Sequence, residues 1–216
     1  MEQKPEGDLE VLIKKVGKMS ERGKFIVLYG PNNLGKSLQI KMLEEDLAAL
    51  KYKTIKIKYP VYNLKPTGPI INSVLREGVP MEEKKFQKVY AQNRLDFQPT
   101  LNEYLDRGLF VISEDYSGTG VAWGMSRDIN VEELEKMNEG LLKEDLSLLL
   151  YGSRFREGIE STHRNENDDE LWRTSMKNHL FLGEKYGWEK VLANQTPEKV
   201  HKDIMEILKN KKIIES

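Results

Sequence analysis

FIVLYGPNNLGKSLQ, residues 25–39, is the stretch of this sequence that decides the fold. Its first five residues are apolar and predict a short buried strand. They run into GPNNLGKS, residues 30–37, which satisfies the G-x-x-x-x-G-K-[ST] pattern of a P-loop. Apolar residues then recur at helical spacing and predict one buried helix face, made of Ile40, Leu43, Leu47 and Leu50. Strand and helix provide the context that a phosphate-binding loop requires; the alternative is a glycine-containing loop that only joins them.

The bulk composition bounds the class of protein. A chain of 216 residues suits one domain with a substantial core. Its 34 Lys and Arg against 35 Asp and Glu give a net charge of -1, so no basic excess indicates a nucleic-acid partner. The absence of cysteine excludes disulfides and thiolate metal sites. There is no signal-peptide core and no apolar run of about 20 residues, so we expect a soluble, cytoplasmic protein without a membrane partner.

The stretch that precedes the first strand predicts a helix. Apolar residues recur at helical spacing between Asp8 and about Glu21, and Asp8 suits the N-cap position. We interpret this helix as a packing element within an N-terminal extension, residues 1–23.

The rest of the chain predicts alternating strands and helices. Strands are expected at residues 54–59, 109–112, 146–151 and 190–193. Helices are expected at residues 69–76, 82–107, from Val131, 169–186, and from Thr196-Pro197. Pro99 predicts a kink in the 82–107 helix or its division into two pieces. Residues 113–124 form a glycine-punctuated segment for which no helix is predicted, and the charge-rich residues 152–168 suit a mobile surface segment.

This alternation predicts an α/β fold with a five-stranded parallel sheet and helices on both faces, in a single domain spanning residues 1–216. Right-handed crossovers place the loops that follow the strands at one edge of the sheet, where ligands bind.

Ordered motifs along the chain resemble those of the thymidylate kinase family, from about Lys24 to Leu208. The motifs are GPNNLGKSLQ at residues 30–39, the Tyr59-Pro60 pair, AQNRLDFQP at 91–99, Glu114-Asp115-Tyr116, and KYGWEKVLANQTPEKVHKDI at 185–204. The resemblance implies a P-loop NTPase-type three-layer α/β/α fold, ATP and Mg²⁺ as cofactors, nucleotide substrates as partners, and a possible homodimer.

On the donor side, the resemblance implies that the loop presents backbone N–H groups to the ATP phosphates. Lys36 would reach the β- and γ-phosphates, and the Ser37 hydroxyl would help to hold Mg²⁺. A solvated lysine is the alternative for Lys36. The residues expected to bind the cofactor are Gly30, Asn32, Asn33, Leu34, Gly35, Lys36, Ser37 and Leu38.

On the acceptor side, Arg94 matches the arginine that the family uses for the acceptor phosphate, although it can equally be a surface charge. Glu114, at the end of a buried strand, would hold Mg²⁺ through water or accept the acceptor's proton; capping the following turn is the alternative. The residues expected to bind the acceptor are Asn32, Tyr59, Arg94, Tyr116, Thr119, Gly120 and Trp123, of which Trp123 can equally belong to the core.

Several residues depart from the family's pattern, and three of them bear on the acceptor. Asn32 replaces an aspartate that reaches the acceptor's sugar hydroxyl, and Asp115 and Tyr62 each replace an arginine. An anion at position 115 would repel an acceptor phosphate by several kcal/mol if desolvated. The P-loop also has no arginine, so the catalytic one must come from the lid segment at residues 152–168. Arg154, Arg156 and Arg164 lie there, and which of them acts stays open; Arg156 and Arg164 are taken as the catalytic candidates.

The leading hypothesis is an ATP- and Mg²⁺-dependent nucleoside-monophosphate kinase that converts dTMP and ATP to dTDP and ADP. One alternative is a deoxynucleoside kinase, whose acceptor has no phosphate and does not need the two missing arginines. Another is a degenerate kinase-like protein that binds nucleotide without turnover.

Overall fold

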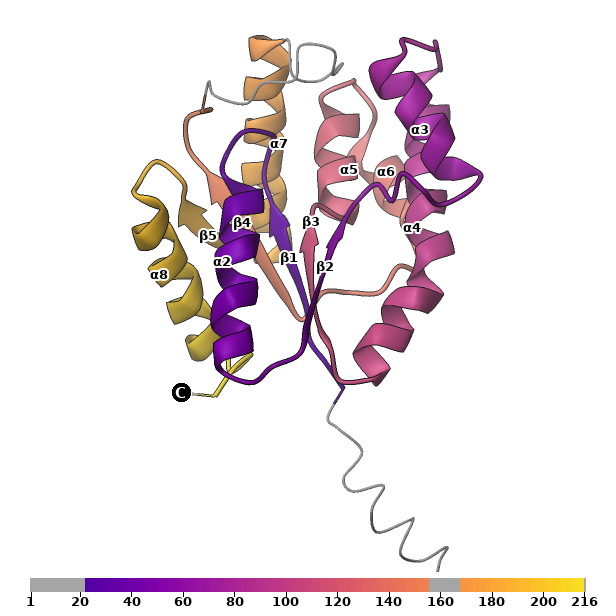
Figure 1. Cartoon of the computed structure of the whole chain (residues 1–216). Coiled ribbons are helices and arrows are strands. Elements are labelled where there is room, and N and C mark those ends of the chain that lie inside the picture. The colour runs from indigo at the N-terminus through magenta and orange to yellow at the C-terminus, as the bar shows by residue number, and fades with distance from the viewer. Residues whose placement is uncertain (1–21, 156–167, 216) are drawn as a thin grey trace, which may run out of the picture.

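A computed structural model describes residues 22–155 and 168–215 as one five-stranded sheet covered by helices (Figure 1). All pairings in the sheet are parallel, and the strand order is β2-β3-β1-β4-β5. The strands are β1 Phe25–Tyr29, β2 Thr54–Lys58, β3 Phe110–Glu114, β4 Leu146–Tyr151 and β5 Glu189–Leu192. Because every strand points the same way, all their carboxyl ends meet at one edge of the sheet.

The central strand β1 is buried on both faces, as its five apolar residues predict. Side chains alternate along a strand, so Ile26 and Leu28 enter one apolar cluster, and Phe25, Val27 and Tyr29 enter the other. The two clusters are the two halves of the core, one on each face of the sheet.

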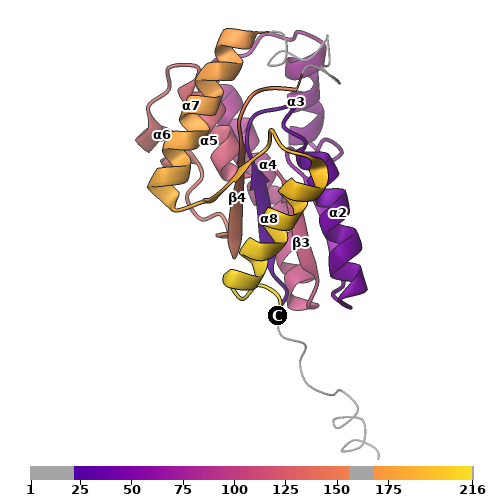
Figure 2. The ribbon, with the colours of Figure 1, turned by 90° about the vertical axis from the view of Figure 1, so that its left-hand side faces the viewer.

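Helices cover both faces and complete three layers (Figures 1 and 2). On one face lie α2 (Lys36–Ala49) and α8 (Pro197–Asn210), which contact each other. On the other lie α4 (Glu83–Asp106), α5 (Ser117–Met125) and α7 (Asp169–Tyr186). Two shorter helices are added at the outside: α3 (Thr67–Arg76) packs on α4, and α6 (Val131–Met137) packs on α5.

The predicted fold class is confirmed, and three local predictions need correction. The residues 117–125, for which no helix is predicted, form α5. Helix α4 runs unbroken through Pro99, so the division into two pieces is wrong. Leu50, expected on the buried face of the P-loop helix, is 48% exposed because α2 ends at Ala49.

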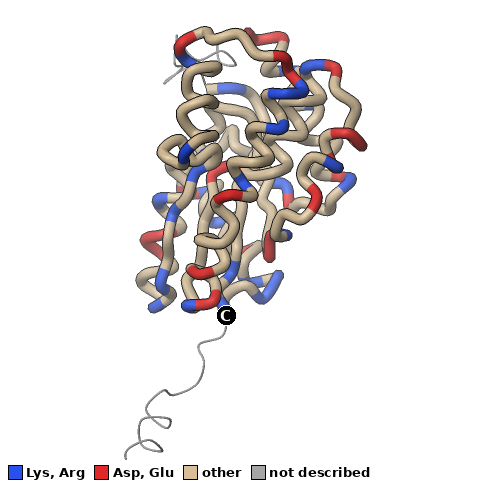
Figure 3. The backbone as a smooth tube through the Cα atoms, turned by 90° about the vertical axis from the view of Figure 1, so that its right-hand side faces the viewer, with Lys and Arg blue, Asp and Glu red and all other residues tan. Residues whose placement is uncertain are grey.

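Some expectations lie outside the described residues. These are the helix at residues 8–21 and most of the 152–168 segment. Within the described ranges, no helix is long and apolar enough to cross a membrane. Basic and acidic residues are interspersed along the backbone (Figure 3).

Candidate active site

The loop between β1 and α2 turns sharply because three of its residues have left-handed backbone geometry. Gly30, Asn33 and Gly35 have φ angles of 132°, 62° and 78°. A Cβ at Gly30 would also lie 2.5 Å from the carbonyl oxygen of Leu150, so only glycine fits there. Asn tolerates positive φ better than other residues with a side chain, which lets position 33 close the loop.

The first turn of α2 is suited to binding an anion. The helix starts at Lys36, and its N-cap, Gly35, supplies no side-chain hydrogen bond to the first-turn N–H groups. These donors, together with the helix dipole, form an anion site. The Lys36 ammonium folds back over the loop and donates to the carbonyl oxygens of Gly30 (2.6 Å) and Pro31 (2.9 Å). The residues present therefore fit the phosphates of a nucleotide.

Residues from α7 and from the segment that follows β4 brace the loop from outside. The indole N–H of Trp172 donates to the Asn32 carbonyl at 2.8 Å, and the Phe155 N–H donates to the Asn33 carbonyl at 2.9 Å. Arg154 also reaches the loop, with its Nη2 3.4 Å from Asn33 Oδ1 and its Nη1 3.2 Å from Asp169. Of the three lid arginines, the structure thus brings Arg154 to the P-loop.

The other two lid arginines, Arg156 and Arg164, lie outside the described residues.

Glu114 and Ser37 meet at the sheet edge because β1 and β3 are neighbours. The Ser37 hydroxyl donates to Glu114 Oε2 at 2.7 Å. Lys58, the last residue of β2, is in register with Glu114, and its ammonium donates to Oε1 at 2.8 Å. Burial would raise the pKa of Glu114, but the charges of Lys36 and Lys58 and these hydrogen bonds outweigh it and hold the pKa below its usual range. A hydroxyl beside an ionised carboxylate suits Mg²⁺, which prefers oxygen ligands.

Asp115 turns the chain out of β3 with a φ of 64°. Its carboxylate lies 3.5 Å from the Lys36 ammonium and accepts a hydrogen bond from the Thr119 hydroxyl at 3.0 Å. Burial and the neighbouring charge of Glu114 raise the pKa of Asp115, and the charge of Lys36 opposes them. The anion expected at this position is therefore matched by the P-loop lysine.

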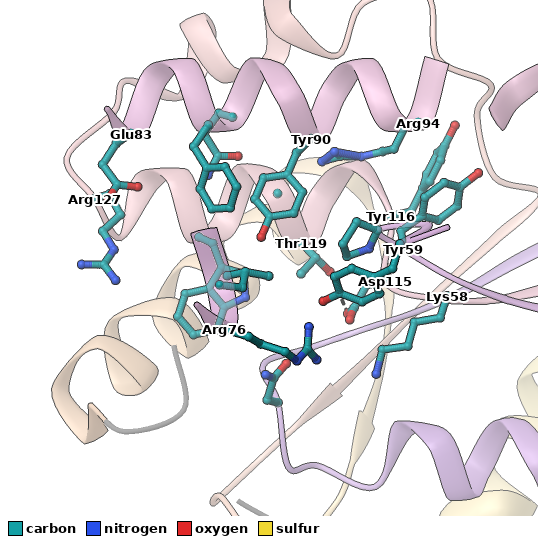
Figure 4. A pocket seen from close by; sticks show the side chains of 18 residues that line it. Lys58, Tyr59, Arg76, Glu83, Tyr90, Arg94, Asp115, Tyr116, Thr119 and Arg127 are labelled. Atoms are coloured by element: carbon teal, nitrogen blue, oxygen red, sulfur yellow. Dashed lines mark hydrogen bonds between the residues drawn. The ribbon is translucent and has the colours of Figure 1, made fainter. Parts of the chain in front are cut away.

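A cavity adjoins the P-loop at Asn32 and extends between α3, α4 and α5 (Figure 4). All seven residues expected to bind the acceptor line this cavity: Asn32, Tyr59, Arg94, Tyr116, Thr119, Gly120 and Trp123. The structure thus brings the predicted donor and acceptor residues together at one sheet edge.

Arg94 is a buried cation in the cavity wall. Its side chain comes from α4 and packs against α5, where its Nη2 would lie 2.1 Å from a Cβ added at Gly120. Only 3% of Arg94 is exposed, and its Nε has no hydrogen-bond partner in the described part of the chain. Burial lowers the pKa of Arg94. A buried guanidinium with an unsatisfied donor in a cavity wall is suited to a polar or anionic ligand.

Sequence reasoning missed several cavity residues that follow from helix and strand geometry. Tyr90 precedes Arg94 by one helical turn and so shares its face of α4. Lys58 is the last residue of β2, and residues at the carboxyl ends of parallel strands lie at the ligand-binding edge, so its place in the sequence could have predicted it. Arg76 and Arg127 also line the cavity, but Arg76 is the last residue of α3 and Arg127 follows α5, and neither carries a local pattern.

The fold and the loop define a P-loop α/β protein, with an anion-binding loop and a second cavity side by side. A family model described as thymidylate kinase matches residues 28–204, and the chain belongs to that family.

Individual relatives agree with this assignment. A thymidylate kinase from Homo sapiens is 27% identical over 190 residues, which cover 86% of this chain and 89% of the relative. A thymidylate kinase from Plasmodium falciparum is 28% identical, covering 86% of this chain and 89% of the relative. The solved structure of a thymidylate kinase from Candida albicans superposes with a TM-score of 0.77 at 22% identity, covering 90% of this chain and 96% of that one. At that identity the structural likeness shows the fold alone.

Proposed function

We propose that this protein is an ATP- and Mg²⁺-dependent nucleoside-monophosphate kinase that converts dTMP and ATP to dTDP and ADP. The observation that carries the proposal is the shared position of Asn32, which belongs to the anion-binding loop and also lines the second cavity. Phosphoryl transfer requires the donor phosphate and the acceptor oxygen to meet in line, and adjoining sites allow this.

On the donor side, the first-turn N–H groups of α2 bind the phosphates, and Lys36 turns from its loop carbonyls toward them. Ser37 and Glu114 would hold the Mg²⁺ ion, which would neutralise charge on the phosphates. Gly30, Asn33, Leu34 and Gly35 shape the loop, and Leu38 lies 46% exposed in the first turns of α2. No side-chain group of the protein forms a covalent bond in this reaction.

On the acceptor side, Arg94 donates to the acceptor from α4, and Tyr59, Tyr116 and Trp123 form the cavity wall. Glu114, the last residue of β3, lies at the same sheet edge and is the candidate that would accept the acceptor's proton. The residues 1–216 form one kinase domain, in which residues 1–23 are an extension. Residues 152–168 act as a lid that supplies a cation from Arg154, Arg156 or Arg164.

The Asp115 carboxylate favours one second candidate, a deoxynucleoside kinase. Asp115 lies beside Lys36 and lines the cavity, where it would repel an acceptor phosphate but not an uncharged hydroxyl.

An acceptor panel tests the proposal. Purified protein with ATP and Mg²⁺ is assayed against dTMP, dUMP, dCMP, dGMP and thymidine by a coupled ADP assay. We expect turnover on dTMP, and we expect Lys36→Ala to reduce kcat at least about 100-fold. Turnover on thymidine but not dTMP would favour the deoxynucleoside kinase, and nucleotide binding without any turnover would favour the degenerate kinase-like protein.

A further inference from the structure

The Arg76 side chain lines the cavity, and no local sequence pattern predicts that it would do so. It is the last residue of α3, and its side chain extends into the cavity toward the end where Asp115 and Lys58 lie (Figure 4). Arg94 enters from α4 on another side of the same cavity (Figure 4). The two arginines therefore address different parts of a bound acceptor.

An aromatic ring and an amide orient the Arg76 side chain. Its guanidinium carbon lies 4.8 Å from the centroid of the Tyr62 ring, in a cation–π contact. Its Nη1 is 3.5 Å from Asn72 Oδ1, one helical turn back, and Asn72 itself donates to Glu77 at 3.1 Å. A stacked guanidinium loses less freedom when it binds an anion than an unsupported one.

The Arg76 end of the cavity is also the end nearest the P-loop. Figure 4 places the Arg76 side chain toward Lys58, which pairs with Glu114, and Glu114 accepts from the P-loop serine, Ser37. In a phosphoryl transfer, the acceptor's reacting oxygen must come within about 3–3.5 Å of the donor phosphate. If that oxygen belongs to a phosphate, its charge therefore lies at this end of the cavity.

At this end of the cavity, each of the two carboxylates is paired with one lysine. The Glu114 carboxylate is matched by Lys58 at 2.8 Å, and the Asp115 carboxylate is matched by Lys36 at 3.5 Å. Lys36 is assigned to the donor phosphates in the proposed reaction, so a further cation is needed for an acceptor phosphate beside Asp115.

We infer that Arg76, stacked on Tyr62, binds the phosphate of the acceptor and makes the site select a nucleoside monophosphate over an uncharged nucleoside. The inference rests on the proposed function and names the residue that sets its acceptor class. A planar guanidinium suits a phosphate dianion because two of its N–H groups can donate in parallel.

Arg76→Met tests this role because methionine retains much of the side-chain length without the charge. The KM for dTMP should rise about 10- to 100-fold, the range that loss of a charged hydrogen bond predicts. The KM for ATP and the calorimetric Kd for thymidine should each change by less than about twofold. Arg107→Met is the matched control, because Arg107 lies outside the cavity and its side chain is 65% exposed beside Glu103.

The Tyr62 support is tested separately. Tyr62→Leu removes the ring face and should raise the KM for dTMP about 2- to 5-fold, whereas Tyr62→Phe, which restores the ring, should recover most of that loss. A purely structural role of Arg76 would instead change ATP and thymidine binding together with dTMP binding.

The outcomes separate this inference from the proposed function. If the wild-type protein turns over dTMP and Arg76→Met retains its KM for dTMP, the inference alone is overturned. If the wild-type protein neither binds nor phosphorylates any monophosphate in calorimetry and assay, both fail together. A selective rise in the KM for dTMP supports both.

Discussion

Among the single residues of the site, Asp115 is the one that we expect to oppose the binding of phosphates. Its carboxylate holds Lys36 in the free protein and adds a negative charge beside the loop. Asp115→Asn keeps an oxygen that accepts from Thr119 but removes that charge. We expect the Kd for ADP, measured by calorimetry at neutral pH, to fall about 3- to 10-fold, since relief of a partly screened repulsion is worth on the order of 1 kcal/mol.

The pH dependence of this effect follows from the Asp115 pKa, which burial and Glu114 raise and Lys36 opposes. As pH falls, the wild-type carboxylate takes up a proton and becomes neutral like the amide. The difference in the Kd for ADP between the wild type and Asp115→Asn should therefore become smaller as the pH is lowered. Weaker ADP binding in the variant at neutral pH would show that Asp115 supports the loop instead of opposing the ligand.

Gly120 determines where the Arg94 guanidinium can lie. A Cβ at position 120 would lie 2.1 Å from Arg94 Nη2, so Gly120→Ala must displace this group. We expect the KM for dTMP to rise at least about 10-fold and the KM for ATP to stay within about twofold. Alanine favours a helix over glycine by about 1 kcal/mol, so loss of helix propensity cannot cause the change.

Gly118→Ala on the same helix is the comparison. Its Cβ would lie 2.4 Å from the Trp188 ring and not from Arg94, so it should lower stability by about 1–3 kcal/mol. An unchanged KM for dTMP in Gly120→Ala would mean that Arg94 does not contact the acceptor.

Among the site residues, those within a motif could be predicted from the sequence, and those placed by packing could not. The loop from Gly30 to Ser37 has a local pattern, and strand register then brings Ser37 to Glu114. Arg76 reaches the cavity only because α3 packs on α4, and no local spacing encodes that contact.

At the scale of elements, α7 contains a buried histidine that makes folding sensitive to acid. His179 is fully buried, and its Nδ1 lies 2.8 Å from the Ser175 carbonyl oxygen. Burial lowers the pKa of His179 to about 3, despite the opposing bond to Ser175. Because the folded pKa lies below the unfolded value of about 6.5, His179 supports stability above that pH and loses it as pH falls.

Urea unfolding at pH 7 and pH 5 measures this contribution. His179→Asn retains a donor near the Nδ1 position but does not titrate. The wild-type free energy of unfolding should fall by about 2 kcal/mol more than that of the variant between these two pH values. Equal losses in the two proteins would show that His179 is not neutral in the folded state.

The elements that sequence reasoning missed are those in which tertiary contacts override local propensity. Three glycines in α5 disfavour a helix, yet each gives room to a packed side chain: Gly118 to Trp188, Gly120 to Arg94 and Gly124 to Leu134. Pro99 disfavours an unbroken helix in the same way. There, Gln98 donates to the Gly140 carbonyl and accepts from the Leu142 N–H, which ties this part of α4 to a neighbouring loop.

In the molecule as a whole, the parallel sheet places two candidate binding sites at one edge. The P-loop follows β1, Glu114 ends the adjacent β3, and Lys58 ends β2 beyond it. Each site uses different elements: the donor site uses β1 and α2, and the cavity uses α3, α4 and α5. The two ligands should therefore stabilise the fold separately.

Thermal unfolding tests this separation. MgADP and dTMP, each at about 100 times its Kd, should each stabilise the protein by about 2.7 kcal/mol and raise Tm by roughly 5–10 °C. Together they should give about the sum of the two shifts, because their sites share Asn32 but few other residues. Lys36→Ala should abolish the MgADP shift and retain the dTMP shift. Gly120→Ala, at the same ligand concentrations, should retain the MgADP shift and reduce the dTMP shift to about half or less. Loss of both shifts in either variant would mean that the two ligands bind one site. If the sites are independent, a defect in one of them leaves the Tm shift caused by the other ligand unchanged.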